Sequence, residues 1–119
     1  MPNRTDNDPE LVKLRQILQD NADKSFVQRI VNYMGPQNSP VLDLGNGELA
    51  THRMAWNEAG GRYFAYPTVL MGQDGKLKDY GDSAWDHVVK TGNYIEFQSP
   101  QEADWFSKNY KRIWPEQFR

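Results

Sequence analysis

His52 and His87 are the side chains of this chain whose charge normally changes near neutral pH. His52 alternates with Met54 and Trp56, so these three side chains are expected on the inward face of one strand. Asp43 lies on the strand expected to pair with that segment, and an Asp–His pair could act as a general base with its orienting carboxylate. The alternative is a half-buried histidine satisfied by a carboxylate. We favour the alternative because the sequence reveals no third catalytic member.

The chain contains no cysteine. This composition excludes disulfide bonds, thiolate catalysis and zinc sites built on cysteine. The two histidines are far apart in the sequence, which is a poor signal for a metal site without a carboxylate at ligand spacing. His87 is expected to be a solvated helix residue that points away from its neighbour Asp86. We therefore predict no bound metal and no cofactor.

Paired carboxylates could catalyse the hydrolysis of a glycosidic bond. Glu58 is expected at an exposed turn, and Glu96 is expected on the solvent side of a short strand. Glu102 is explained by a capping box that begins at Ser99. No pair stands out, so the sequence favours a protein that is not an enzyme. The carboxylates considered are Glu48, Glu58, Glu96, Glu102 and Asp104.

Arg53 and Arg62 are expected on neighbouring strands, where they could form a small positive site. They could equally pair with Glu48 or Glu58 across the hairpins. Aromatic side chains that stay exposed often anchor protein interfaces. The candidate binding residues are therefore His52, Arg53, Arg62, Tyr63 and Tyr66.

Basic and aromatic residues also mix at positions 108–114. Such a mixture can bind single-stranded nucleic acid. However, lysine and arginine in the last turn of a helix also stabilise the helix dipole. The net charge of -2 argues against binding driven by bulk electrostatics. We do not expect a nucleic-acid partner.

Four segments have the apolar spacing of helices. Asp8 is a good N-cap for the first helix, with Pro9 at its first position. Ser99 and Pro100 give the same signal for the last helix. The expected helices cover residues 9–19, about 23–34, 82–90 and 100–112.

The segment 41–69 predicts three antiparallel strands joined by two tight turns. Gly45-Asn46-Gly47 and Gly60-Gly61 supply residues that tolerate positive φ. Because strands lie on both sides of them, these turns are not expected to bind phosphate. Pro67 lacks an N–H, so its strand should lie at an edge or stop pairing there. A further short strand is expected at 94–97.

The resulting order is ααβββαβα, which predicts an α+β fold. A small antiparallel β-meander of three to four strands should pack against about four helices. The 119 residues suit one domain, expected at 9–119 after a flexible N-terminal segment at 1–8. No stretch approaches the roughly 20 apolar residues of a membrane span, and the first residues do not form a signal peptide.

Several stretches together resemble a small domain encoded by tailed bacteriophages and prophages. There the domain occurs as a short protein or as a module of large virion polypeptides. The similarity covers roughly residues 24–114, and the helix at 9–19 lies outside it. The resemblance carries no catalytic residues to this chain. The matching stretches are residues 50–56, 61–63, 66–69, 91–97 and 102–111.

The resemblance implies a non-enzymatic virion structural or assembly protein. Its partners would be other virion proteins or further copies of itself, located in the virion or the host cytoplasm. One alternative is an early phage protein that binds and inhibits a host enzyme. A second alternative is a cell-wall-degrading accessory enzyme that uses His52 with Asp43 or another acidic residue.

Overall fold

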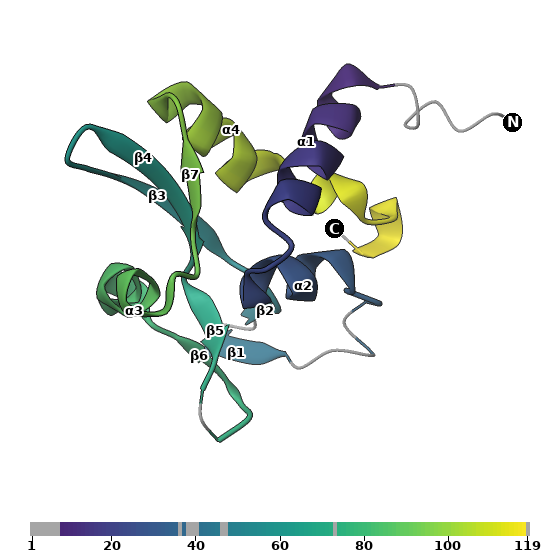
Figure 1. Ribbon diagram of the computed structural model, residues 1–119. Coiled ribbons are helices and arrows are strands. Elements are labelled where there is room, and N and C mark those ends of the chain that lie inside the picture. Colours follow the sequence, from purple (N-terminus) through teal and green to yellow (C-terminus); the bar gives the residue numbers. More distant parts are fainter. Residues whose placement is uncertain (1–7, 36, 38–40, 46–47, 73, 119) are drawn as a thin grey trace, which may run out of the picture.

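A computed structural model describes residues 8–35, 37, 41–45, 48–72 and 74–118 (Figure 1). The α-helices are α1 (Pro9–Asp20), α2 (Ser25–Val31), α3 (Ala84–Thr91) and α4 (Pro100–Asn109). The strands are β1 (Leu42–Gly45), β2 (Glu48–Ala50), β3 (Met54–Ala59), β4 (Arg62–Pro67), β5 (Val69–Met71), β6 (Leu77–Asp79) and β7 (Ile95–Phe97). Short 3-10 helices are η3 (Gly81–Ser83), η4 (Tyr110–Ile113) and η5 (Glu116–Phe118). The predicted α+β class is confirmed.

The strands form three small antiparallel sheets within the described residues, with the orders β1-β2, β3-β4-β7 and β5-β6. The hairpin predicted around Gly60 and Gly61 is confirmed, because both glycines have positive φ and Ala59 pairs with Arg62. β1 and β2 also form a hairpin, with Leu42 opposite Ala50. Residues 46 and 47 of the first predicted turn lie outside the described residues.

The prediction that His52 lies on one strand with Met54 and Trp56 is wrong. β2 ends at Ala50 and β3 begins at Met54, and the two strands belong to different sheets. The backbone between them makes other bonds: the Arg29 side chain donates to the carbonyl of Thr51, and the N–H of Thr68 donates to the carbonyl of Arg53. The predicted meander is therefore divided at residues 51–53.

Pro67 is the last residue of β4. Of the two outcomes predicted for it, an edge strand or a strand that stops there, the second is observed. β4 is the middle strand of its sheet, not an edge. Pro67 stands opposite Met54 in the register, whereas pairing with β7 reaches only Ala65. The strand can therefore end at proline without an unmade bond to β7.

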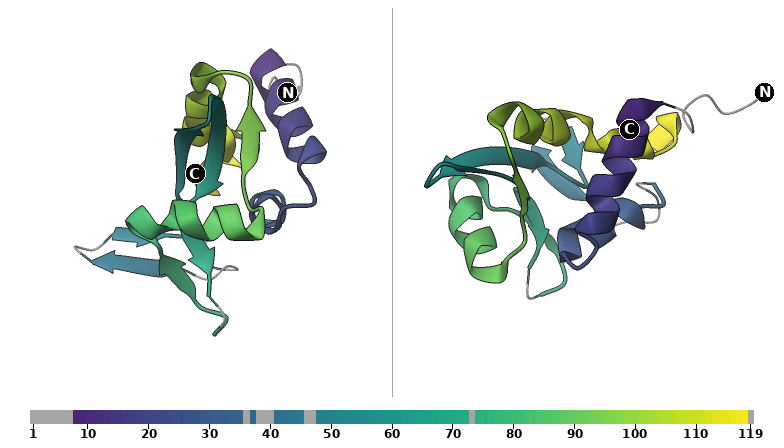
Figure 2. Two further views of the ribbon diagram at one scale, coloured as in Figure 1. Left: turned by 60° about the vertical axis from the view of Figure 1, so that its left-hand side comes forward. Right: turned by 45° about the horizontal axis from the view of Figure 1, so that its top comes forward.

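The side chains of β4 alternate between two layers. Ala65 is fully buried in the main core, and Tyr63 packs against the same core. The rings of Phe64 and Tyr66 point to the other face, where their centroids lie 5.4 and 5.3 Å from that of Trp85. Figure 2 shows α4 and α3 on opposite faces of this sheet.

The main core joins α1, α2 and α4 to one face of the central sheet. These helices form because their apolar residues recur at helical spacing. Side chains cap the first turns of α1 and α4, whereas Lys24 at the N-cap of α2 makes no such bond. Asp8 accepts a hydrogen bond from the N–H of Glu10, and Ser99 accepts one from Glu102, as predicted for both caps. The buried residues of the helices are Leu11, Leu14, Leu18, Phe26, Val27, Ile30, Ala103 and Phe106.

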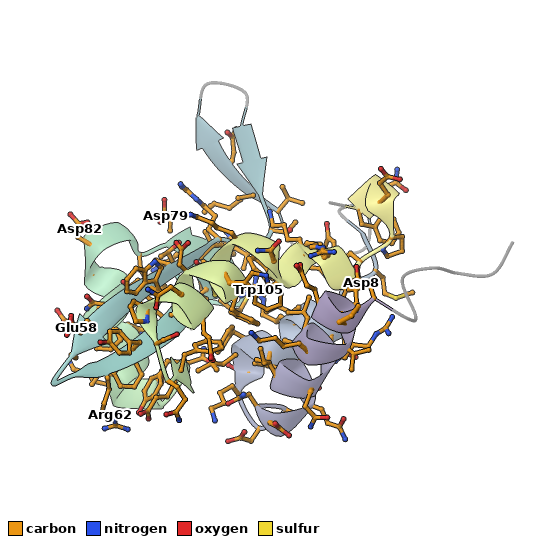
Figure 3. The ribbon with its side chains drawn as sticks, turned by 90° about the horizontal axis from the view of Figure 1, so that it is seen from above. Asp8, Glu58, Arg62, Asp79, Asp82 and Trp105 are labelled. Atoms are coloured by element: carbon orange, nitrogen blue, oxygen red, sulfur yellow. The ribbon has the colours of Figure 1, made fainter. Side chains whose placement is uncertain are left out.

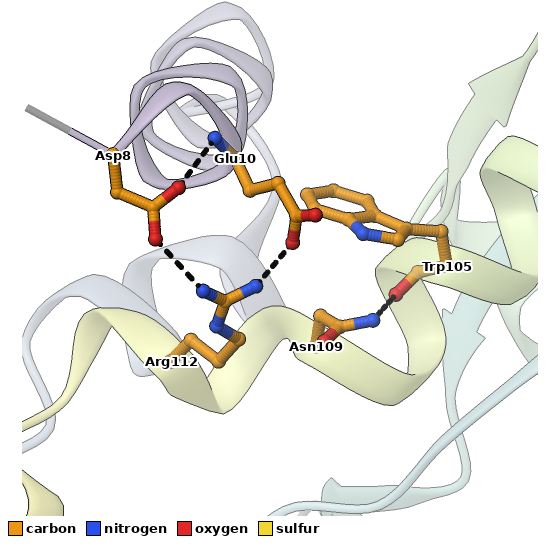
Figure 4. A network of polar contacts seen from close by, with 5 residues as sticks. All are labelled: Asp8, Glu10, Trp105, Asn109 and Arg112. Atoms are coloured by element: carbon orange, nitrogen blue, oxygen red, sulfur yellow. Dashed lines mark hydrogen bonds and ion pairs between the residues drawn. The ribbon is translucent and has the colours of Figure 1, made fainter. Parts of the chain in front are cut away.

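Polar contacts hold the C-terminal turns against the first two helices. The Arg112 guanidinium bridges two carboxylates of α1, with 3.0 Å to Asp8 and a second hydrogen bond to Glu10 (Figure 4). The indole N–H of Trp114 donates to the carbonyl of Ile30 at 2.8 Å. Segments at the two ends of the described chain are therefore packed together.

Gly35 occupies a position where two constraints coincide. Its φ is +95°, and a Cβ added there would lie 2.8 Å from Cε1 of Phe118. Gly75 also has positive φ, but a Cβ added there meets nothing within 4 Å. Comparison of the two glycines separates backbone strain from the collision.

We expect Gly35→Ala to lower the free energy of unfolding by about 1 kcal/mol more than Gly75→Ala, because only the first displaces a ring. Urea denaturation of the two variants measures this difference. In a Phe118→Ala background, Gly35→Ala and Gly75→Ala should lower the free energy of unfolding by the same amount, because no ring is left to displace. Equal losses for both glycine variants in the wild-type background would contradict the proposed collision.

Candidate functional site

Arg29 positions the break between β2 and β3. Its side chain leaves α2 and donates to two backbone carbonyls, 2.6 Å to Thr51 and 3.1 Å to Val69. Burial lowers the pKa of the guanidinium, which still stays charged at all ordinary pH values. These two charge-assisted bonds connect α2 to the chain just before β3 and to the first residue of β5.

His52 is held inside an aromatic cluster next to this bridge. Its side chain is 6% exposed, and its ring centroid lies 5.1 Å from that of Tyr33 and 5.0 Å from that of Trp114. Nδ1 lies 3.0 Å from the hydroxyl of Thr51. Nε2 is buried and has no hydrogen-bond partner among the described residues.

The environment of His52 keeps its imidazole neutral. Burial is the largest cause that lowers the pKa of His52 to about 3. The positive charges of Arg29 and Lys111 also lower this pKa, whereas the backbone of Arg29 raises it by less than burial lowers it. A base with so low a pKa is poorly matched to proton transfer near neutral pH. This arrangement favours the structural interpretation of His52.

The predicted pair of His52 with Asp43 does not form. Asp43 stands opposite Leu49 in the β1–β2 ladder, whereas His52 lies beyond the end of β2. Within the described part of the chain, neither ring nitrogen of His52 contacts a carboxylate. The expectation failed because it assumed that one strand continued through position 52.

A pocket of about 290 Å³ opens beside His52. A second pocket, of about 410 Å³, lies between α1, α2 and η4. Gln28 lines both pockets, so α2 separates them. The first pocket is lined by Gln28, Arg29, Asn32, Tyr33, Thr51, His52 and Met71. The second is lined by Arg15, Leu18, Gln19, Ala22, Gln28, Val31 and Ile113.

The outer face of α2 between the pockets, formed by Gln28, Val31 and Asn32, is called the α2 ridge below. The Gln28 side chain donates to the carbonyl of Ala22 at 2.6 Å and accepts from the Asn32 amide at 3.3 Å. These bonds fix the two polar side chains of the α2 ridge. Val31 is 51% exposed at the end of the ridge. Met34 is 65% exposed three residues later.

The structure distributes the other candidate binding residues over separate places. Arg62 lies at the tip of the β3–β4 hairpin and points outward (Figure 3). It pairs with Glu96, with 2.9 Å between Nε and Oε2. Their hydrogen bond, and then their opposite charges, raise the pKa of Arg62; the same bond lowers the pKa of Glu96.

Arg53 lies at the other end of this hairpin, 3.6 Å from Asp79. The two arginines therefore do not form one positive site, and each has its own carboxylate. Tyr66 lines a further pocket together with Arg53, whereas Tyr63 packs on the opposite face of β4.

His87 is half-buried and its ring stacks on Tyr80, with 4.6 Å between the ring centroids. The prediction of a solvated side chain at His87 is therefore corrected.

Two of the other carboxylates considered in the sequence can be placed. Asp104 accepts from the indole of Trp56 and pairs with Lys108. Glu58 is exposed. Nowhere among the described residues do three side chains that could bind a metal ion lie together. In the same part of the chain, no helix has the length and apolar character needed to cross a membrane.

Sequence reasoning missed Arg29, although it connects three elements. Arg29 stands beside Ile30 in a helix whose apolar face was recognised, but nothing local distinguishes it from a solvated arginine. Comparisons with protein-family models, with curated proteins and with solved structures gave no match.

The neutral state of His52 predicts a specific dependence of stability on pH. Its pKa is about 3 in the folded protein and 6.5 ordinarily, so between these values the unfolded chain binds the extra proton. Stability from this residue is fully present above the ordinary pKa and is lost as pH falls toward 3. The slope is at most about 1.4 kcal/mol per pH unit.

We expect His52→Phe to flatten the fall in the free energy of unfolding between about pH 6.5 and pH 4, because phenylalanine cannot take up a proton. Urea denaturation at several pH values measures this slope. Tyr33→Phe is the matched control, since it removes a polar atom from the same cluster and leaves the imidazole. Identical slopes for wild type and His52→Phe would show that His52 is not held neutral.

Proposed function

We propose that this chain is a non-enzymatic structural or assembly component of a tailed-bacteriophage particle, acting through protein–protein contacts. The phage association rests on the resemblance of residues 24–114 to domains of phages and prophages. The contact surface rests on the α2 ridge and on the pockets at its two sides. That pair of pockets is the observation that carries the proposal.

Two pockets beside one helix suit a protein partner. Interfaces draw most of their binding free energy from a few side chains that enter pockets and lose their water. A partner could place one side chain on each side of the α2 ridge and cover Val31 between them. The exposed Met34 and Met71 add adaptable apolar surface near the same helix.

The state of His52 supports a binding role over an enzymatic one. Its imidazole is buried, and its pKa lies far below neutrality, so it is a weak base at the pH of a cell. Its ring instead forms part of the wall of the first pocket. At His52 a partner would meet an uncharged ring, beside the Arg29 guanidinium that lines the same pocket.

Substitution of Val31 tests the proposed surface. Val31 and Val89 are equally exposed, at 51% and 50%, and each lies in the last turn of its helix. Lysine is favourable at the end of a helix, so Val31→Lys and Val89→Lys should both fold. Only Val31→Lys places a charge between the two pockets.

We expect the chain to be present in purified particles of the phage or induced prophage that encodes it. In a strain lacking the gene, complementation with Val31→Lys should reduce its incorporation into particles by about tenfold or more, because the charge must be desolvated at the interface. Val89→Lys should be incorporated like wild type. Quantitative mass spectrometry of purified particles gives the measurement.

Three results would count against the proposal. Absence of the wild-type chain from particles would exclude a virion role, and its recovery with one host enzyme would favour the inhibitor alternative. Equal incorporation of the two lysine variants would exclude the α2 ridge as the contact surface.

A further inference from the structure

A separate pocket of about 510 Å³ lies on the α3 side of the central sheet. Its volume falls in the range of about 300–1,000 Å³ that is typical of small-molecule sites. Asn57 and Tyr66 reach it from β3 and β4, and Trp85 reaches it from α3. Asp79 ends β6 and Asp82 lies in η3, and Figure 3 shows both on the same side of the molecule.

Aromatic rings form one part of the pocket lining. The ring centroids of Tyr66 and Trp85 lie 5.3 Å apart, and the ring of Phe64 supports Trp85 from the sheet at 5.4 Å. Tyr66 and Trp85 are both half-buried, so each keeps part of its surface accessible. Their positions are fixed by packing, which prepares an apolar surface for a ligand at little entropic cost.

Several polar groups of this pocket have no hydrogen-bond partner within the described residues. They are the amide Nδ2 of Asn57, the hydroxyl of Tyr66, the indole N–H of Trp85 and the carboxylate of Asp82, although the Asp82 charge does act on Tyr66. Burial, and then the negative charge of Asp82, raise the pKa of the Tyr66 hydroxyl, which therefore remains a donor. Arg53 and Asp79 contribute a pair whose separation is 3.6 Å.

The charges in the pocket discriminate between classes of ligand. An anion would meet the carboxylates of Asp79 and Asp82, whose two negative charges exceed the single positive charge of Arg53 in the same lining, so it would be repelled. An ammonium ion would be attracted by Asp82 and the rings, but it carries no acceptor for the donors of Asn57, Tyr66 and Trp85. Donors that lose water without gaining an acceptor oppose binding.

A neutral polyhydroxylated ring meets both requirements. Each hydroxyl donates one hydrogen bond and accepts others, so it can bind to carboxylates and to N–H groups in the same pocket. The C–H face of a sugar ring can pack on an aromatic side chain. We propose that this pocket, formed by Asn57, Tyr66, Asp79, Asp82 and Trp85, binds a neutral carbohydrate. This inference does not rest on the proposed particle role.

The test is an NMR titration of the ¹⁵N-labelled protein with neutral sugars at millimolar concentration. The probes are methyl glucoside, methyl mannoside, methyl galactoside, N-acetylglucosamine and rhamnose. At least one probe should give saturable shifts that include the Asn57 amide and the Trp85 indole N–H. Trp85→Phe assigns the indole signal.

Variants then establish the site. Asp82→Asn and Tyr66→Phe should each weaken binding by about tenfold, because each alters a group that bonds to the sugar. Asp86→Asn and Tyr63→Phe are the matched controls. Asp86 lies in α3, which directly follows the η3 segment of Asp82, and Tyr63 lies on β4 with Tyr66, but neither control residue lines the pocket. Both controls should bind like wild type.

Three outcomes would overturn the proposal. No saturable shift of the pocket signals with any of the sugars would exclude a carbohydrate site of useful affinity. Equal shifts with tetramethylammonium or sulfate would show that the pocket selects charge. Wild-type affinity in both Asp82→Asn and Tyr66→Phe would place sugar binding elsewhere.

Discussion

The hydrogen bonds of Arg29 are the constraint on which the arrangement of this protein depends. One guanidinium donates to the carbonyl of Thr51, beyond the end of β2, and to the carbonyl of Val69, at the start of β5. Because its charge is partly buried, the arginine must keep these acceptors. The bridge therefore separates the β1–β2 hairpin from the central sheet and directs His52 toward Tyr33 and Trp114.

The same break distributes side chains between two pockets. Thr51 and His52 line the pocket beside the α2 ridge, whereas the next residue, Arg53, lines the pocket on the α3 side. An extended chain sends successive side chains in different directions, so three residues outside a strand can serve two surfaces. A protein contact at the α2 ridge and a sugar in the α3-side pocket would thus depend on one structural element.

The predictable parts of this fold are those that short segments determine. Asp8 with Pro9 and Ser99 with Pro100 begin helices through bonds to residues two or three positions away. The break at 51–53 has no such local cause, because Arg29 lies 22 positions from Thr51 and 40 from Val69. The α3-side pocket was equally hidden: Asn57, Asp79 and Trp85 meet only after β6 and α3 pack on the sheet.

The free energy of unfolding of Arg29→Lys tests the central role of this bridge most directly. Lysine keeps the charge, but its ammonium cannot reproduce the planar fork that reaches two carbonyls. We predict a loss of about 2–4 kcal/mol, because one or both charge-assisted bonds are lost and an acceptor stays buried. Arg62→Lys, in the exposed pair with Glu96, gives the reference for a solvated arginine. A loss for Arg29→Lys no larger than that of Arg62→Lys would contradict the account.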